Sequence, residues 1–308
     1  MPRFVQFDKF GSREYLRVVE RKRPWPGPGQ ILVRVMAAGL NLIDVKVYRD
    51  ESAGGRFGVT LPSGIGQDFA GFVEELGAGV TAFEVGEAVF GSAPFASIAD
   101  FVIVRADAQV ARKPDPLPFE VAGSLGVVGR TAMAAVGSLG LTEHDTVLVS
   151  AAAGGVGVLA AQLAIRAGAR VVGTASEENH DYLEGLGVIP VAYGDGMTQR
   201  IREALDDGDR LTAVLDQHGP DTIDAALELG VAADRINTIA AFGPSARGAN
   251  TVGGAQTTAE AMSEIAEMLA ENELVLPIDS IFPIERVAEA YGRLEAGHLR
   301  GKIVIVTE

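Results

Sequence analysis

The feature that most constrains the fold is a cluster of small residues between an apolar run and a helical pattern. Residues 147–168 read VLVSAAAGGVGVLAAQLAIRAG. We expect a strand over 146–150, a tight turn, a helix from about Gly155 and a second strand over 170–174. This order of elements is typical of an open parallel sheet with helices on both faces, a doubly wound α/β fold.

The spacing of small residues in this turn indicates what it can hold. The pattern G-x-G-x-x-G falls on Ala152, Gly154 and Gly157, with Ala in the first place. Tiny residues let backbone N–H groups approach a pyrophosphate, and the following helix start offers unpaired N–H groups and partial positive charge. The flanking strand and helix supply the context that a lone glycine motif lacks. We therefore predict dinucleotide binding by Ala152, Gly154, Gly155, Val156 and Gly157; the alternative is a turn that only packs helix on sheet.

The pattern of apolar residues changes near residue 118. Before it, short apolar or alternating runs such as QILVRVMAAGL and turn-rich stretches such as RPWPGPGQ indicate strands, and no long helical period is evident. After it, short strands alternate with helical patterns, as expected for a parallel sheet. The last segment adds two helical patterns and a closing strand, KIVIV, which we expect to return to the first part of the chain.

Composition excludes several classes of protein. The net charge is −15 and no basic block is present, so nucleic acid is not an expected partner. Cysteine is absent, which excludes disulfides, thiolate nucleophiles, iron–sulfur clusters and cysteine-ligated zinc. The sequence has no apolar run of the roughly 18–20 residues that a membrane helix needs, and no signal-peptide pattern. We therefore expect a cytoplasmic protein with no membrane partner.

The end of the second predicted strand indicates which dinucleotide is bound. NAD binders usually place Asp or Glu there, whereas this chain reads VVGTASEEN. The missing carboxylate leaves room for a 2′-phosphate, to which Ser176 could donate. Glu177 and Glu178 follow directly and would repel a phosphate unless they point away. The balance favours NADPH over NADH.

Several motifs in order resemble those of one family over essentially the whole chain. The chain resembles the quinone oxidoreductase (zeta-crystallin-like) branch of the zinc-independent medium-chain dehydrogenase/reductase superfamily. The motifs that carry the resemblance are AAGLNLIDVKVYRD, GIGQDFAGFVEELGAGVTAFEVGEAVFG, GRTAMAAVGSLGLTEHDTVLVSAAAGGVG and GHLRGKIVIV.

The resemblance implies a domain organisation and a cofactor. A GroES-like catalytic domain would comprise residues 1–115, completed by about 265–308, and a Rossmann domain would comprise 116–264. NADPH would lie in the cleft between them, and such enzymes are commonly homodimers. One departure concerns the adenosine phosphate: many relatives carry a Lys where this chain has Asn179, and His180 is the only potential cation nearby.

The sequence does not predict a catalytic metal. Where zinc relatives have His in a GHE segment, this chain reads GQD at 66–68, and its four histidines lack metal-ligand spacing with one another. Without a Lewis acid, hydride transfer to an electron-poor carbon is the better match. A quinone or an α,β-unsaturated carbonyl compound can take the charge as an enolate, and water can supply the proton. The alternatives are an enoyl-thioester or biosynthetic double-bond reductase, and a non-catalytic NADPH-binding or redox-sensing protein.

The candidate catalytic residues are Asn41, Tyr48 and Thr131. By resemblance, the Asn41 amide would donate to the substrate carbonyl, and the alternative is a turn Asn that bonds its own backbone. Tyr48 could donate from its phenol or lie at the core edge. Thr131 could contact the nicotinamide or bond back to a helix carbonyl. Asp44 is expected to be structural.

Later strand ends supply further cofactor candidates. Ser176, Asn179 and Tyr193 would meet the adenosine end, with simple packing as the alternative for Tyr193. Phe242 and Gly243 follow a later strand, where such sheets bind ligands, although a core position for Phe242 is an equal alternative. Lys302, near the C-terminus, is expected in a salt bridge at the surface, and contact with a cofactor phosphate is the alternative.

Overall fold

The computed structural model describes residues 1–107, 110–205 and 208–307. They form two compact units. The first unit comprises Met1–Val127, Ala259–Glu273 and the segment from Pro277 onward; the second comprises Val128–Thr258 and Leu274–Leu276. The expected α/β fold class is confirmed, because the first unit is rich in antiparallel strands and the second contains a parallel sheet.

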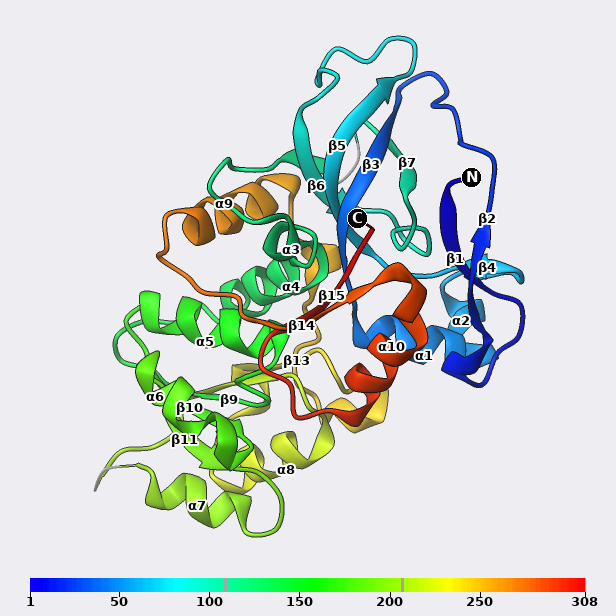
Figure 1. Cartoon of the computed structure of the whole chain (residues 1–308). Helices are drawn as coiled ribbons and strands as arrows, with labels where there is room; N and C mark the ends of the chain where they lie inside the picture. The colour runs from blue at the N-terminus through cyan, green and yellow to red at the C-terminus, as the bar shows by residue number, and fades with distance from the viewer. Residues whose placement is uncertain (108–109, 206–207, 308) are drawn as a thin grey trace. The chain divides into compact units, whose positions relative to one another are not determined.

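The second unit is built on a five-stranded parallel sheet with strand order β11-β10-β9-β12-β13. Its strands are β9 (Thr146–Val149), β10 (Arg170–Ala175), β11 (Ile189–Ala192), β12 (Ala213–Asp216) and β13 (Ile236–Thr238). Its connecting helices are α5 (Gly155–Arg166), α6 (His180–Gly185), α7 (Met197–Glu203) and α8 (Pro220–Glu228). The chain runs from β9 outward to one edge and then from β12 to the other, so the order reverses between these strands (Figure 1). This reversal is the switch point at which doubly wound sheets bind ligands.

The opening strand–turn–helix–strand of this sheet matches the sequence prediction to within one residue at each boundary. The local cause is visible in the burial. Leu148 and Val172 are fully buried on adjacent strands, and Val158 to Ala161 of α5 have no exposed surface. Continuous apolar strands are expected where helices cover a parallel sheet.

The first unit contains a seven-stranded sheet of order β14-β15-β3-β5-β6-β8, with β7 also paired to β3. Its strands are β3 (Gln30–Gly39), β5 (Asp68–Leu76), β6 (Ala88–Ser92), β7 (Phe101–Arg105), β8 (Val110–Arg112), β14 (Ile278–Pro283) and β15 (Lys302–Val306). A smaller sheet joins β2 (Leu16–Glu20), β1 (Arg3–Phe7) and β4 (Ser63–Gly64). The helices are α1 (Leu42–Arg49), α2 (Glu51–Arg56), α3 (Phe119–Ala122), α9 (Ala259–Ala270) and α10 (Val287–Ala296), and α4 (Leu125–Gly137) continues into the second unit. Helices α1 and α2 are short and lie in the stretch that the sequence predicted to be rich in strands, without a long helical period.

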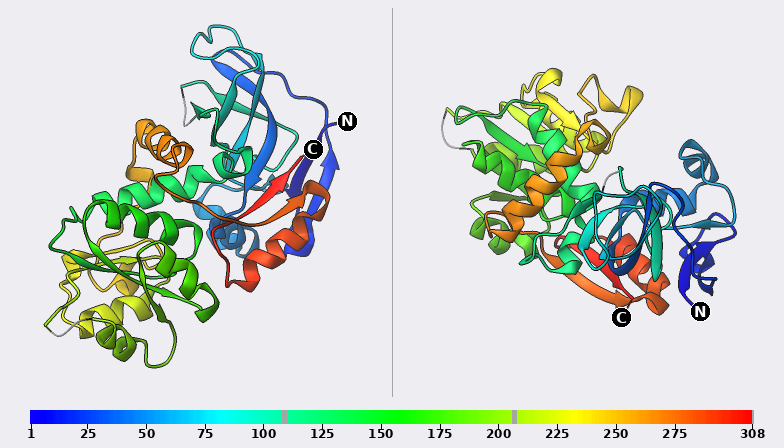
Figure 2. Two further views of the ribbon diagram at one scale, coloured as in Figure 1. Left: turned by 60° about the vertical axis from the view of Figure 1, so that its left-hand side comes forward. Right: turned by 90° about the horizontal axis from the view of Figure 1, so that it is seen from above.

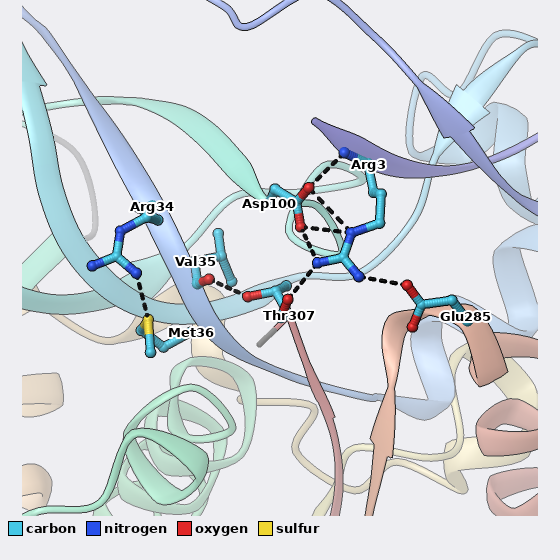
Figure 3. Close-up of polar contacts among 7 residues, drawn as sticks. All are labelled: Arg3, Arg34, Val35, Met36, Asp100, Glu285 and Thr307. Atoms are coloured by element: carbon cyan, nitrogen blue, oxygen red, sulfur yellow. Dashed lines mark hydrogen bonds and ion pairs between the residues drawn. The ribbon is translucent and has the colours of Figure 1, made fainter. Parts of the chain in front are cut away.

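The final strand of the chain belongs to the first unit. β15 pairs antiparallel with β3, with Val304 opposite Gly39, and the two strands run side by side in Figure 2. The two chain ends are also linked: the Arg3 guanidinium donates to the Asp100 carboxylate at 2.7 Å, to Glu285 and to the carbonyl of Thr307 (Figure 3). The pairing of β15 with β3 places Lys302, the first residue of β15, beside the end of β3. No helix in the described part of the chain combines the length and apolarity needed to cross a bilayer.

Candidate functional site

A group of buried polar side chains lies in the first unit where β3 passes into α1. We call Asn41, Asp44, Gln67, Asp68 and Lys302 the buried polar cluster; each is less than 9% exposed. Helix α1 begins directly after Asn41, and the Asp44 carboxylate accepts a hydrogen bond from the Asn41 backbone N–H at 2.9 Å. A carboxylate in the first helical turn satisfies a donor that the helix leaves unpaired. Asp44 therefore has the structural role expected from the sequence.

The side chain of Asn41 is held from both ends. Its Nδ2 donates to Asp68 Oδ2 at 2.9 Å and to the carbonyl of Gly39 at 3.3 Å. Its Oδ1 accepts from Lys302 Nζ at 2.6 Å. The predicted donation from this amide to a substrate carbonyl would require the longer contact, to Gly39, to be exchanged. That catalytic role stays a prediction.

Lys302 is not at the surface, so that expectation was wrong. The side chain is 3% exposed, and its Nζ donates to the Leu40 carbonyl at 2.5 Å as well as to Asn41. Burial lowers the pKa of this amine, whereas the nearby carboxylates of Asp68 and Asp44 oppose that shift. A buried lysine is tolerated here because it faces two buried carboxylates.

Burial shifts the pKa of the ionisable side chains in and beside the cluster. Burial raises the pKa of Asp44 to about 7, while hydrogen bonds from the Asn41 N–H and the Gln67 amide oppose the rise. The Gln67 contact, from Nε2 to Asp44 Oδ1, is 3.3 Å long. Burial also raises the pKa of Tyr291, with the charge of Asp44 as a further cause. Burial thus holds the pKa of Asp44 well above the usual range of an aspartate.

The structure gives Tyr48 a defined partner. The side chain is fully buried, its ring packs edge-on against Tyr291, and its hydroxyl donates to Glu295 Oε1 at 2.5 Å. Burial, followed by the contact with Glu295, raises the pKa of the phenol. Arg13 and Arg49 also pair with Glu295. These contacts favour the core-edge alternative, and the catalytic role of Tyr48 stays a prediction.

The glycine turn of the second unit has the geometry that a pyrophosphate needs. A Cβ at Gly157 would lie 2.1 Å from the carbonyl oxygen of Ala151, so any larger residue clashes with the turn. Gly154 is the N-cap of α5 and has no side chain that could cap the helix. The first-turn N–H groups of Gly155, Val156 and Gly157 are therefore left to a ligand or to water. The residues present fit a dinucleotide pyrophosphate.

Ala152, the first residue of the motif, packs inside the protein, and its N–H is already used. It is fully buried, and its N–H donates to the Thr174 carbonyl of β10 at 2.9 Å. This contact makes Ala152 part of the packing beneath the turn. Ala151, the residue before it, has a φ of 49°, a left-handed conformation that is uncommon outside glycine.

The end of β10 brings two predicted adenosine residues, Ser176 and Asn179, into one network with Glu178. Asn179 is 4% exposed, and its Nδ2 donates to Ser176 Oγ at 3.1 Å. Ser176 Oγ in turn donates to Glu178 Oε1 at 3.2 Å. Glu178 therefore points toward Ser176 and not away from it.

The next strand end presents Tyr193. β11 ends at Ala192, and the Tyr193 side chain is 44% exposed, so its predicted contact with the adenosine and the packing alternative both stay predictions. The guanidinium of Arg200 holds this loop by donating to the carbonyls of Ala192, Tyr193, Gly194 and Asp195, at 2.9, 3.0, 3.3 and 2.8 Å.

A buried network at the switch point was missed by the sequence reading. Asp216, at the end of β12, is fully buried and accepts hydrogen bonds from Ser150 Oγ at 2.8 Å and Thr238 Oγ1 at 2.6 Å. Ser150 follows β9 and Thr238 ends β13, so one carboxylate ties together the ends of three strands. The sequence carries a sign of this network, because a polar residue (Ser150, Asp216 or Thr238) stands at the end of each of the three apolar strands.

The remaining predicted residues lie in the second unit. Phe242, after β13, is 61% exposed, so the core alternative for it was wrong, and Gly243 follows with a φ of 57°. Thr131 is buried in α4, and a Cβ on Gly254 would lie 3.1 Å from its Oγ1. In the residues that the structure describes, no group of three or more His, Cys, Asp or Glu is placed to hold a metal ion.

Comparisons with known proteins agree with this architecture. Residues 27–132 match the family model described as alcohol dehydrogenase GroES-like domain, and residues 186–305 match the one described as zinc-binding dehydrogenase. The chain is 27% identical to a quinone oxidoreductase of Pseudomonas aeruginosa, over 99% of this chain and 100% of that protein.

Solved structures show the same likeness. A quinone oxidoreductase from Coxiella burnetii superposes with a TM-score of 0.86 at 29% identity, covering 100% of this chain and 99% of that one. A mycobacterial protein solved as a complex with NADPH also gives a TM-score of 0.86, at 28% identity and 100% coverage of both chains. The chain belongs to the medium-chain dehydrogenase/reductase superfamily of oxidoreductases, in its quinone oxidoreductase branch.

Proposed function

We propose that this chain is an NADPH-dependent reductase that transfers hydride to a quinone or an α,β-unsaturated carbonyl compound without a metal ion. The observation that carries the proposal is the glycine turn at the switch-point sheet, where Gly157 permits close approach and α5 starts without a side-chain cap. The quinone oxidoreductase relatives and the NADPH-complexed mycobacterial neighbour support it.

Residues of the second unit would hold the cofactor. The first turn of α5 would take the pyrophosphate, since its N–H groups and dipole favour an anion. The residues that follow β10, β11 and β13 would contact the adenosine and nicotinamide halves, because ligands of doubly wound sheets bind at the carboxyl ends of the strands. Tyr193 and Phe242 present exposed aromatic rings at two of these ends.

The donor set favours a conjugated acceptor. The segment where zinc relatives have a His ligand supplies Gln67 and Asp68, and both are committed to other partners: Gln67 donates to Asp44, and Asp68 accepts from Asn41. Cysteine ligands are absent from the sequence. When bound, the reduced nicotinamide supplies the hydride. A conjugated acceptor delocalises the resulting negative charge onto its oxygen, so that the chain need only orient the substrate and offer a hydrogen-bond donor.

Initial rates of NADPH oxidation test this proposal. The purified chain is assayed in the presence of EDTA with a quinone, an enone, an enoyl thioester and a simple ketone. We expect turnover with the quinone or the enone and none with the ketone. Turnover restricted to the enoyl thioester would replace the proposed substrate class by the alternative one. Loss of activity in EDTA, restored by zinc, would contradict the metal-free mechanism.

A further inference from the structure

We propose that Glu178 determines how strongly this chain discriminates between NADPH and NADH. Its carboxylate opposes a 2′-phosphate at the end of β10 and accepts an unphosphorylated ribose, so that the preference for NADPH is weak and NADH is also used. This inference rests on the proposed function, since it concerns the adenosine end of the same cofactor.

The position of Glu178 follows from the sheet. β10 is the second strand of the doubly wound order, and the residues directly after such a strand meet the ribose 2′ position. Ser176 is the first residue after β10. Ala175 of β10 pairs with Ala192 of β11, so Tyr193 follows the neighbouring strand at the same level as Ser176.

The hydrogen bonds of Ser176 commit its only proton. Its hydroxyl donates to Glu178 Oε1 at 3.2 Å and accepts from the amide of Asn179 at 3.1 Å. The donor to Ser176 is a buried side chain, since Asn179 is only 4% exposed. For Ser176 to donate to a phosphate, its bond to Glu178 must break.

The charges act in the same direction. A phosphate monoester carries about −1.5 to −2 charges near pH 7 and only accepts hydrogen bonds. A carboxylate beside Ser176 therefore repels it, whereas the hydroxyls of an unphosphorylated ribose donate to a carboxylate. Glu178 thus penalises NADPH and supports NADH.

The cation of the adjacent loop is already committed. Arg200 uses Nε, Nη1 and Nη2 to hold the carbonyls of residues 192–195. Position 179 is an uncharged asparagine, whose amide donates to Ser176 Oγ. Position 179 therefore supplies no cation for a 2′-phosphate, and Arg200 is held by the carbonyls of its own loop.

Nucleotide titration of three proteins tests the inference without any acceptor substrate. The wild type, Glu178→Gln and Glu177→Gln are titrated with NADPH and NADH, and with 2′,5′-ADP and 5′-AMP as probes of the adenosine end alone. Glutamine keeps an acceptor for Ser176 while removing the charge, and Glu177 is the matched control one residue away. Both glutamates are exposed, so both variants are expected to fold.

We expect Glu178→Gln to tighten the Kd for NADPH and for 2′,5′-ADP about tenfold, the size of the interaction between a carboxylate and a phosphate dianion across several ångströms of water-like dielectric. The Kd for NADH and 5′-AMP should stay unchanged or weaken, and Glu177→Gln should change every Kd less than about twofold because it lacks the Ser176 contact.

The inference is overturned if Glu178→Gln shifts NADPH and NADH equally, or shifts NADPH no more than Glu177→Gln does. Failure of the wild type to bind either dinucleotide would overturn the inference and the proposed function together. Intact binding with no turnover of any acceptor would contradict the proposed function alone.

Discussion

Replacing Lys302 with methionine should destabilise the first unit severely. The ammonium group is 3% exposed, donates to Leu40 O and Asn41 Oδ1, and faces the carboxylates of Asp44 and Asp68. Removing one partner from a buried charge pair costs about 3–5 kcal/mol, since the remaining charge is left uncompensated. Each buried acceptor left without a donor adds about 1–3 kcal/mol, which the apolar methionine side chain partly offsets. We expect a net loss of about 4 kcal/mol at pH 8.

The pH dependence gives this prediction its specific signature. Lys302 lowers the pKa of Asp44, so its removal raises that pKa further above about 7. The folded variant then binds a proton that the unfolded chain does not, and the loss should be smaller at pH 5.5 than at pH 8. Denaturant unfolding followed by circular dichroism measures both values. Lys46→Met, on the exposed side of α1, is the control and should change stability by less than about 0.5 kcal/mol. A loss under about 1 kcal/mol at pH 8, or one that grows as the pH falls, would refute the reasoning.

Three further predictions concern single residues of the two units. Gly157→Ala should abolish measurable NADPH binding, because the added Cβ would lie 2.1 Å from Ala151 O; a titration with an unchanged Kd would contradict the proposed pyrophosphate site. Asp44 has a folded pKa of about 7 against 3.8 unfolded, so the stability that it contributes is complete below about pH 4 and is lost as the pH rises through 7. Asp44→Asn should remove this dependence, which amounts to about 4 kcal/mol in the free energy of unfolding. Denaturant unfolding measures that free energy at several pH values. An equal change with pH in the two proteins would show that Asp44 does not titrate as described. Asn41→Ala should lower kcat by about tenfold or more if its amide reaches the substrate carbonyl, and an unchanged kcat in the enone assay would leave Asn41 only its contacts with Asp68 and Lys302.

The second unit could be predicted from sequence because its key elements are local. The strand β9, the turn and α5 are contiguous, and the small residues are required by a clash within the turn itself, between Gly157 and Ala151. Helix α1 was harder, since it is two turns long and its start is signalled only by the pair Asn41 and Asp44.

The contacts missed from sequence join residues far apart in the chain. Lys302 resembles a surface lysine until β15 pairs with β3 and brings it to Asn41. The polar residue at the end of each apolar run was visible in the sequence, but only the sheet shows that Asp216 meets Ser150 and Thr238. Conversely, the direction of Glu178 could not be predicted from its position, because a carboxylate three residues after a strand can face either way.

The most direct test of the proposed chemistry follows the hydride itself. NADPH carrying deuterium at the transferable C4 position is incubated with the chain and an enone in the presence of EDTA, and the product is examined by NMR. The account predicts one deuterium on the carbon β to the carbonyl and none on the carbonyl carbon. Deuterium on the carbonyl carbon, or a reduced product without deuterium, would contradict it.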